Sequence, residues 1–407
     1  MKVALLCIGD ELLKGSTVNT NLAFLGEQLL RIGIIPELSL EIPDRRDSIL
    51  KALDYAYSKA DTVITSGGLG PTSDDITKDS IAEYFHLPLE KNEQIEAHLT
   101  AWWQKLHSGP VPFHWNRQAY FPAGANIIPN RFGSAPGIHL EWNGKAIFML
   151  PGPPAELHPM FEEGMLERIR KKRKTPVYAS LTHVVGIGES IVEERTQPLL
   201  REGISVAYCA SPGHVKLFFT SKDELLLNQV TREARELFAG DILSEGVSTL
   251  PEEILRLLEK RQFTLATAES CTGGMISAQL TAVPGSSAVF LGGAATYSNR
   301  LKQLILGVSE TTLAKFGAVS RECAKEMVEG VCSRTGADAG ISVTGIAGPS
   351  GGTPDKPVGR VYIGVKLHDT TRIFECNFRG GREQVRNQTV ARALNELRKL
   401  LLREPEQ

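Results

Sequence analysis

The stretch that decides the fold is Thr62-Val63-Ile64-Thr65-Ser66-Gly67-Gly68-Leu69-Gly70-Pro71-Thr72-Ser73-Asp74-Asp75. Its first five residues predict a buried strand. The glycine-rich loop after them predicts that this strand ends at Ser66, at the carboxyl edge of a sheet. The start of the chain repeats this order, because the apolar residues 2–9 run directly into Asp10-Glu11. A strand near 34–42 and a helix near 46–59 are predicted between the two loops. This alternation of strands and helices favours a parallel sheet covered by helices.

The alternation is interrupted near residues 91–116 and resumes with a predicted strand at 146–150. The interrupting stretch holds three of the four Trp residues together with His98, His107 and His114. The spacing of these histidines disfavours metal binding by them. A dimer contact or a lid is the favoured interpretation of the stretch.

Three domains are expected along the chain. The basic run 168–174 is typical of a solvated helix end that leads into a linker, and contact with an acidic partner is the less favoured alternative. Residues 175–245 predict a small strand–helix–strand–strand–helix unit. A third alternating unit begins at Pro251 and closes with an amphipathic helix near 383–403. The expected domains are 1–170 and 248–407, both α/β, and a small α+β domain at 171–247 between them.

Composition limits the classes of function. The chain has 407 residues, and its 45 Lys and Arg against 47 Asp and Glu give a net charge of −2, which does not favour a general polyanion binder. No apolar run approaches the roughly 20 residues that cross a bilayer. The six cysteines show no CxxC pair and no metal-type spacing, which favours free thiols in a reducing compartment. We expect a cytoplasmic protein that binds neither nucleic acid nor membrane.

Two acidic loops follow the first and third predicted strands, at Gly9–Gly15 and Gly67–Asp75. In an open parallel sheet both lie at the carboxyl edge, where glycines let backbone N–H groups approach a phosphate. Four carboxylates beside such loops suit a divalent cation that bridges a pyrophosphate while a carboxylate positions water. The alternative is structural: the glycines form turns, and Asp74 caps a helix that begins near Ile76.

The N-terminal motifs resemble those of the CinA (competence/damage-inducible) proteins, whose first domain is similar to the molybdopterin-binding fold. The resemblance rests on the two loops and on Asn19-Thr20-Asn21, Asn116-Arg117-Gln118-Ala119, Gly133-Ser134-Ala135-Pro136-Gly137 and Pro151-Gly152-Pro153-Pro154-Ala155-Glu156. It implies a metal-dependent pyrophosphatase that splits ADP-ribose into AMP and ribose 5-phosphate, with Mg²⁺, Mn²⁺ or Co²⁺. The expected metal ligands are Asp10, Glu11, Asp74 and Asp75, the last two also catalytic, and the expected substrate contacts are Asn21, Gly67, Gly68, Gly70 and Thr72.

A second group of polar residues surrounds Ser270, which follows a predicted strand and opens a helix. Such a strand-to-helix turn makes helix N–H groups available to an oxyanion. The C-terminal unit contains only one histidine, His368, so a different base is expected for a serine nucleophile. A lysine made neutral by burial, with a tyrosine that relays the proton, can serve. Cys271 is the rival nucleophile, with less support because it lacks a histidine partner.

The motifs around Ser270 resemble the C-terminal CinA domain, which is similar to the nicotinamide mononucleotide (NMN) deamidases. The resemblance implies hydrolysis of NMN to nicotinic acid mononucleotide and ammonia without a metal or other cofactor. It places the catalytic Ser, Tyr and Lys at Ser270, Tyr297 and Lys302, and we add Arg382 and Arg386 as phosphate partners. The motifs are Ala268–Gly274, Thr296–Lys302, Thr344–Gly352 and Lys356–Tyr362, and the expected substrate contacts are Thr272, Gly273, Gly345, Gly348 and Arg382.

Residues 175–245 look like the KH-like linker domain of CinA proteins. Gly186-Ile187-Gly188-Glu189 is not the basic loop that clamps RNA, so a spacer is favoured over an RNA binder. The resemblance covers nearly the whole chain and suggests a homodimer that acts on the nucleotides NMN and ADP-ribose. The alternative function is a non-catalytic protein that binds a molybdopterin-like or nucleotide ligand and acts in DNA uptake or repair.

Overall fold

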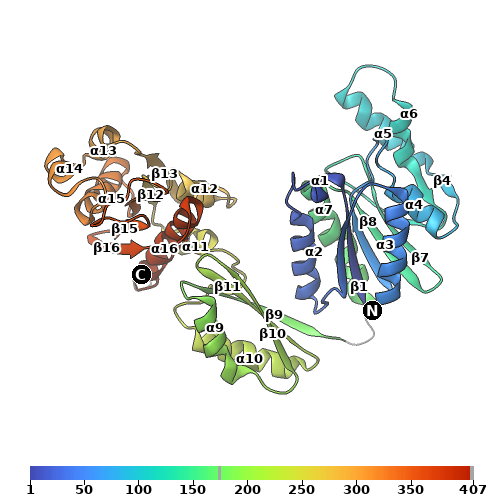
Figure 1. Cartoon of the computed structure of the whole chain (residues 1–407), viewed down its shortest axis with the longest axis horizontal. Helices are drawn as coiled ribbons and strands as arrows, with labels where there is room; N and C mark the ends of the chain where they lie inside the picture. Colours follow the sequence, from blue (N-terminus) through green and yellow to red (C-terminus); the bar gives the residue numbers. More distant parts are fainter. Residues whose placement is uncertain (173–175, 404–407) are drawn as a thin grey trace. The chain divides into compact units, whose positions relative to one another are not determined.

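The structure, a computed structural model, describes residues 1–172 and 176–403 and separates into two compact units (Figure 1). The first unit comprises residues 1–179 and 220–224, and the second comprises residues 180–219 and 225–407. Part of the basic run predicted to lead into a linker, residues 173 and 174, lies outside the described residues. The described part of that run lies at the end of helix α8 (Leu166–Lys171).

The first unit is built on a six-stranded mixed sheet. Its strands are β1 (Val3–Ile8), β2 (Leu38–Ile42), β3 (Thr62–Ser66), β6 (Asn126–Ile128), β7 (Gly137–Trp142) and β8 (Lys145–Leu150). The strand order is β2-β1-β3-β8-β7-β6. The first four strands in this order are parallel, as the alternation predicts, whereas β7 and β6 add an antiparallel edge that the prediction of a parallel sheet did not include.

The antiparallel edge arises from a tight hairpin between β7 and β8. Asn143 and Gly144 connect the two strands, with φ angles of 48° and 76°. Positive φ at both central residues matches the natural twist of two paired strands, and Asn-Gly is a preferred sequence for such a turn. This dipeptide is therefore a sequence signal for the mixed sheet that the prediction did not use.

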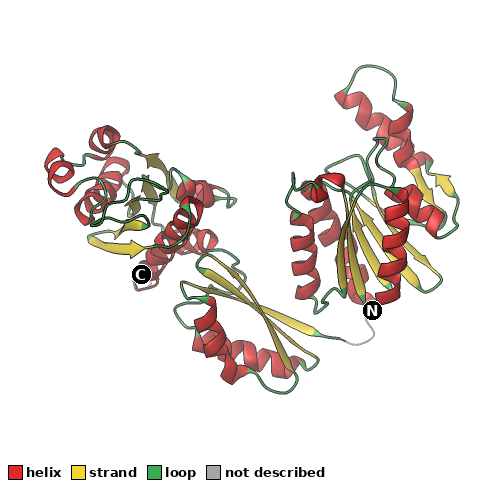
Figure 2. Ribbon diagram, viewed as in Figure 1, coloured by secondary structure: helices red, strands yellow, loops and turns green. Residues whose placement is uncertain are grey.

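Helices cover both faces of the first sheet (Figure 2). One apolar core contains residues of α3 (Arg46–Lys59) and α4 (Thr77–Tyr84). The other contains residues of α2 (Thr20–Arg31) and α7 (Pro154–Met160). β1 is buried along its whole length, because a central strand covered on both faces must be apolar on both. The parallel pairing of β1 with β3 brings the ends of both strands to the same edge of the sheet, where the acidic loops begin.

The Trp-rich stretch forms an extension of the first unit. The rings of Trp103 and Trp115 meet edge to face with their centroids 5.0 Å apart, and Trp115 Nε1 donates a hydrogen bond to the carbonyl of Leu99. These tryptophans therefore hold the extension together, and its role as a dimer contact or lid stays a prediction. The extension contains β4 (Leu89–Lys91), α5 (Glu93–Leu106), α6 (Phe113–Asn116) and β5 (Tyr120–Pro122).

The middle of the chain forms a small three-stranded antiparallel sheet with strands and helices in the predicted order. The elements are β9 (Tyr178–Val185), α9 (Glu189–Thr196), β10 (Ile204–Ser211), β11 (His214–Ser221) and α10 (Glu224–Leu237), and the strand order is β10-β11-β9.

The C-terminal part of the second unit is a five-stranded mixed sheet. Its strands are β12 (Leu265–Glu269), β13 (Phe290–Ala295), β14 (Ala339–Gly345), β15 (Arg360–Leu367) and β16 (Thr370–Asn377). The order is β13-β12-β14-β15-β16, with β13, β12 and β14 parallel and the last two antiparallel. β12 therefore lies between two parallel neighbours and ends at Glu269, directly before Ser270.

Helices form two apolar cores on this sheet as well. α11 (Leu250–Arg261) and α16 (Arg382–Arg403) contribute to one core, and α15 (Arg321–Thr335) contributes to the other. None of the helices in residues 1–172 and 176–403 has the length and apolarity that a bilayer crossing requires. The remaining α-helices are α1 (Asp10–Leu13), α12 (Met275–Thr281), α13 (Asn299–Leu306) and α14 (Glu310–Phe316).

A buried arginine ties the end of the middle domain to the C-terminal helix. The side chain of Arg398 is 2% exposed, and its Nη1 donates to the carbonyl of Gly240 over 2.9 Å. Its Nη2 donates to the carbonyl of Ile242, and its Nε lies 3.4 Å from the carboxylate of Glu253 on α11. Because Glu253 also accepts hydrogen bonds from the backbone and hydroxyl of Ser244, the segment between α10 and α11 is held at several points.

Candidate functional site

The two acidic loops meet at the carboxyl edge of the first sheet. Residues of both line a cavity of about 350 Å³, which we call the acidic pocket. The segments Ser134–Ala135 and Pro151–Pro153 complete its wall. Of the residues predicted for this site, Glu11, Asp74, Asp75, Gly67, Gly68 and Gly70 line the pocket, and Asp10, Thr72 and Asn21 do not.

Two further carboxylates, those of Asp44 and Glu156, line the acidic pocket and were not predicted as site residues. Asp44 follows the end of β2, which makes β2 the third strand with an acidic residue after its end at the same edge of the sheet. Its Oδ2 accepts the backbone N–H of Asp10 over 2.9 Å. Its position after Ile42-Pro43 is the signal that could have identified it, because strand ends are where this pocket takes its residues.

The side chain of Asp10 is paired with Lys14, the residue directly after the same short helix, α1. Its Oδ2 accepts a hydrogen bond from Lys14 Nζ over 3.0 Å, and the side chains are 40% and 69% exposed. The ammonium of Lys14 lowers the pKa of the Asp10 carboxyl. The structure therefore pairs Asp10 with Lys14, and its expected role as a metal ligand stays a prediction.

The glycine-rich loop owes its shape to close contacts. Gly67 has a φ of 101°, and a Cβ there would lie 2.1 Å from the carbonyl oxygen of Ile8, so no other residue fits. A Cβ on Gly70 would lie 2.6 Å from the carboxylate of Asp75. That carboxylate accepts hydrogen bonds from the backbone N–H and the hydroxyl of Thr72, over 2.8 and 2.5 Å. Thr72 and Asp75 thus close the loop upon itself.

The structural alternative for Asp74, capping of the following helix, is wrong. Helix α4 begins at Thr77, and its N-cap residue, Ile76, makes no side-chain capping bond. Asp74 lies at the surface with its carboxylate on the acidic pocket. Asn21, predicted as a substrate contact, donates its amide to the carbonyl of Gly152 over 2.6 Å, and its buried Oδ1 has no hydrogen-bond partner in residues 1–172 and 176–403.

The carboxylate oxygens of the acidic pocket are suitable ligands for a hard divalent cation. Burial raises the pKa of Asp44, and the negative charges of Glu11, Asp74 and Asp10 raise it further, so a cation here would relieve a repulsion. Within the described residues no three Asp, Glu, His or Cys side chains are close enough to chelate an ion by themselves. Mg²⁺ commonly binds through one or two carboxylates, with water and substrate phosphates as its other ligands. Glu11, Asp44 and Asp74 line the pocket, and one or two of them would hold it.

The second site is centred on a serine–lysine pair. Ser270 follows β12 at the turn into α12, and Lys302 lies on α13. Lys302 Nζ lies 2.9 Å from Ser270 Oγ and donates to the carbonyl of Thr296 over 2.8 Å. Both side chains are buried, with exposed fractions of 8% for Ser270 and 1% for Lys302. The two residues predicted as nucleophile and base therefore lie in direct contact.

Burial shifts the pKa of Lys302, the predicted base, and the pKa of Cys271, the rival nucleophile, in opposite directions. It lowers the pKa of Lys302, because the ammonium loses its hydration. It raises the pKa of the Cys271 thiol to about 11, so this residue is a thiol at neutral pH. Since the thiolate is the reactive form of cysteine, the structure favours Ser270 over Cys271 as the nucleophile.

The start of α12 is occupied by a buried carboxylate. Glu269 accepts the backbone N–H groups of Gly274, Ile276 and Ser277 and the hydroxyl of Ser277, over 2.8–3.1 Å. The expectation that this helix end offers its N–H groups to an oxyanion is therefore wrong for these three donors. Thr272 lies beside them with a fully buried hydroxyl that has no partner among the described residues, and it is a donor still available.

Two arginines at the start of α16 connect the remaining predicted residues. Arg382 donates to the carbonyl of Gly348 and to the hydroxyl of Tyr297, each over 2.9 Å. Arg386 donates to the carbonyl of Thr272 over 2.8 Å. Three loops that are distant in sequence are thereby fixed around one helix end. Gly345 ends β14, and Gly273, with a φ of 62°, follows Thr272.

Tyr297 is the predicted residue that the structure leaves outside the serine–lysine pair. Its side chain is 62% exposed, and its described hydrogen bond leads to Arg382 rather than to Ser270 or Lys302. Its role as a proton relay stays a prediction.

Comparisons with known proteins match the chain in two parts. A family described as the CinA C-terminal domain matches residues 247–401, and a family described as a probable molybdopterin binding domain matches residues 4–171. A competence-damage inducible protein of Caldanaerobacter subterraneus is 40% identical over 98% of both chains, and one of Clostridium botulinum is 40% identical over 99% of this chain and all of the relative. A solved structure of a competence/damage inducible protein from Agrobacterium tumefaciens is 40% identical, covers 38% of this chain and 97% of its own, and has a TM-score of 0.35.

Proposed function

From the premise that the chain belongs to the CinA family of competence/damage-inducible proteins, we propose that it is a bifunctional hydrolase of pyridine nucleotides. The C-terminal domain would hydrolyse the carboxamide of NMN to nicotinic acid mononucleotide and ammonia. The N-terminal domain would split the pyrophosphate of ADP-ribose with a divalent cation. The observation that carries the first activity is the buried contact between Ser270 Oγ and Lys302 Nζ.

The chemistry proposed for this pair is acyl transfer. Neutral Lys302 accepts the hydroxyl proton of Ser270 as the oxygen attacks the amide carbon, and the same proton then leaves with the departing ammonia. Water hydrolyses the resulting ester, which releases the acid and restores the serine. The hydroxyl of Thr272 is the donor best placed by its burial and lack of a partner to stabilise the negative oxygen that forms. Arg382, bonded to Tyr297 and Gly348, is the cation that would pair with the substrate phosphate.

Ammonia release from NMN tests the deamidase. It should continue in EDTA, because the Ser270 site contains no expected metal, and it should vanish in Ser270→Ala and Lys302→Met. Cys271→Ala is the matched control, since its thiol is not the nucleophile in this proposal. Deamidation retained in Ser270→Ala, or lost only in Cys271→Ala, would refute the assignment.

The acidic pocket supports the second activity. Its carboxylates fit a divalent cation, whose positive charge would neutralise phosphate oxygens during hydrolysis. Among the chain's own groups, one or two of Glu11, Asp44 and Asp74 would hold the cation, and the narrow loop at Gly67–Gly70 would bring backbone N–H groups close to a phosphate. Asp75 anchors the loop through Thr72, so its loss would disturb the shape of the pocket as well as its charge.

AMP formation from ADP-ribose tests this second activity. It should require added Mg²⁺, Mn²⁺ or Co²⁺ and should fall in Asp74→Asn, which removes the charge of an exposed side chain and keeps its size. Asp75→Ala should lose activity and stability together. A rate that is the same with and without chelator contradicts the proposal.

A non-catalytic binding protein is the competing function. The buried serine–lysine contact favours an enzyme, because a binding site gains nothing from a desolvated amine held against a hydroxyl. Calorimetry with a panel of nucleotides separates the two. Tight binding of NMN or ADP-ribose without turnover of either would favour the binding protein.

A further inference from the structure

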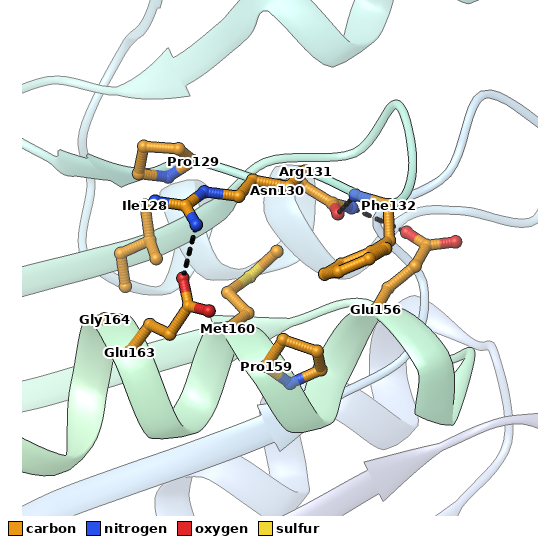
Figure 3. A pocket seen from close by; sticks show the side chains of 10 residues that line it. All are labelled: Ile128, Pro129, Asn130, Arg131, Phe132, Glu156, Pro159, Met160, Glu163 and Gly164. Carbon is orange, nitrogen blue, oxygen red and sulfur yellow. Dashed lines mark hydrogen bonds and ion pairs between the residues drawn. The ribbon is translucent and has the colours of Figure 1, made fainter. Parts of the chain in front are cut away.

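A smaller cavity of about 170 Å³ lies next to the acidic pocket (Figure 3). Ile128, Pro159 and Met160 supply its apolar surface, and Phe132 stands at its wall. In Figure 3 the ring of Phe132 lies over helix α7, between the side chains of Met160 and Glu156. We call this space the Phe132 cavity. Whole small-molecule sites commonly occupy about 300–1,000 Å³, so its size suits one ring system rather than a complete nucleotide.

The Phe132 cavity and the acidic pocket share two walls. Along the loop after β6, Arg131 and Phe132 line the cavity, and Ser134 and Ala135 line the pocket. Along α7 and the turn before it, Pro153 lines the pocket and Pro159 lines the cavity. Glu156 lines both. A ligand that extends along this loop and helix would therefore pass from one space into the other.

Hydrogen bonds within the loop after β6 fix the boundary between the Phe132 cavity and the acidic pocket. Asn130 donates its amide to Glu156 over 2.6 Å and to the carbonyl of Ala135 over 2.9 Å. Its Oδ1 accepts the N–H groups of Phe132 and Gly133, each over 2.9 Å. A Cβ on Gly133 would lie 2.1 Å from the Glu156 carboxylate, so a larger residue there would displace this carboxylate from its position. Asn130 thus fixes the positions of both Phe132 and Glu156.

The charges of the Phe132 cavity do not suit a phosphate. Arg131 is paired with Glu163 at 3.3 Å, and Glu156 adds a second carboxylate. One cation against two carboxylates leaves a negative balance, which repels a phosphate and tolerates a neutral ring. The ring of Phe132 is 60% exposed, so another planar group can reach it and stack on it.

We propose that the Phe132 cavity holds the base of a nucleoside phosphate whose phosphate lies in the acidic pocket, with Phe132 as the stacking residue. The orientation of the ligand in this subsite rests on the proposed pyrophosphatase function. The subsite would distinguish a nucleotide, which carries a base, from a simple sugar phosphate, which does not. Stacking of a base on an aromatic ring commonly contributes a tenfold effect or more on affinity.

Binding of AMP and of ribose 5-phosphate to the full chain, in the same Mg²⁺ buffer, tests this subsite by calorimetry. AMP should bind more tightly than ribose 5-phosphate, which lacks the base. Phe132→Ala should weaken AMP about tenfold and leave ribose 5-phosphate unchanged, and Phe132→Trp should restore AMP binding. Tyr55→Ala, which removes a ring that is 50% exposed on α3, is the matched control and should change neither.

Equal affinity of the unsubstituted protein for both probes, binding of neither, or AMP affinity unchanged in Phe132→Ala would overturn the subsite. Turnover separates this result from the proposed function. If ADP-ribose is hydrolysed, Phe132→Ala should raise KM and leave kcat nearly unchanged. AMP binding that depends on Phe132 without any ADP-ribose hydrolysis would support the subsite and refute the pyrophosphatase.

Discussion

At the residue scale, the serine–lysine contact decides what the second unit is able to do. A lysine at the surface is protonated at neutral pH and cannot accept a proton from a hydroxyl. Lys302 is buried against Ser270 without a described carboxylate partner, so the surroundings favour its neutral form. The burial that makes this amine a base also makes it costly to keep charged.

The pH dependence of deamidation follows from this lowered pKa. As pH rises, the neutral fraction of Lys302 grows, so kcat/KM for NMN should rise and level off at a pH below the ordinary lysine value of 10.5. The same shift should make stability rise with pH between the folded pKa and 10.5, because there the unfolded chain binds the proton more tightly. A pH–rate profile measures the first effect. Lys302→Arg should be inactive at every pH, and a rate that falls through this range would contradict the assignment.

The hydroxyl of Thr272 should matter to the transition state and not to ground-state binding. Thr272→Val keeps the shape of the side chain and removes the donor, so kcat for NMN should fall about 100-fold with KM nearly unchanged. Steady-state kinetics measures the split. Thr281→Val at the end of α12 is the control, because its hydroxyl bonds only to helix carbonyls. An equal loss in both variants would point to a general effect on α12.

Residues within motifs were predicted better than residues outside them. Ser270 and Lys302 were identified from spacing and resemblance, and they lie together. Asp44 was missed because its strand carries no glycine-rich loop, although it ends at the same edge of the sheet. The bond between Tyr297 and Arg382 joins residues 85 positions apart, which no local pattern reveals.

At the element scale, the turn between β12 and α12 depends on Glu269. Four donors converge on a carboxylate that is 1% exposed, so truncation would leave several buried N–H groups unsatisfied. Glu269→Ala should lower the free energy of unfolding by about 2–3 kcal/mol, as measured in urea. Glu310→Ala is the control at the exposed start of α14 and should cost less than about 1 kcal/mol. Equal effects of the two substitutions would show that the Glu269 bonds contribute little.

The glycine-rich loop of the first unit offers a second matched pair. Gly67 and Gly15 both have positive φ, but a Cβ would meet the carbonyl of Ile8 only at Gly67, while Gly15 has nothing within 4 Å. Gly15→Ala should therefore cost about 1 kcal/mol from backbone strain alone. Gly67→Ala should cost distinctly more and should also abolish AMP formation. Similar unfolding midpoints for the two variants would mean that the loop shifts to admit the methyl group.

The alternation of elements was predictable because strands and helices differ in their apolar period. β3 and the helix at 46–59 were predicted with their observed bounds. The antiparallel edge was not predicted, since the short strand β6 carries too few residues for a period. Its signal was the turn, Asn143-Gly144, and not the strand.

At the scale of the whole molecule, the middle domain and the C-terminal domain should unfold together. Arg398 bonds to Gly240 and Ile242 and pairs with Glu253, and these contacts link segments more than 140 residues apart. Sequence patterns do not predict long-range pairing of this kind, because a single arginine on an amphipathic helix is expected to be exposed to solvent.

Arg398→Met should lower the stability of the second unit by about 3–5 kcal/mol, since it leaves the carboxylate of Glu253 buried without its cation. Differential scanning calorimetry should show the transition of the second unit move to lower temperature while that of the first stays in place. Arg392→Met, which breaks a pair on the same helix at a 42% exposed arginine, should cost less than about 1 kcal/mol. A shift of both transitions by Arg398→Met would contradict two independently folding units.

The near-complete burial of Lys302 has a consequence for the life of the protein in a cell. Reactive acyl donors and acetyltransferases modify lysines that they can reach, and this amine, at 1% exposure, is closed to them while the chain is folded. The proposed general base is thereby protected from the acylation that modifies surface lysines, and its charge depends on pH alone.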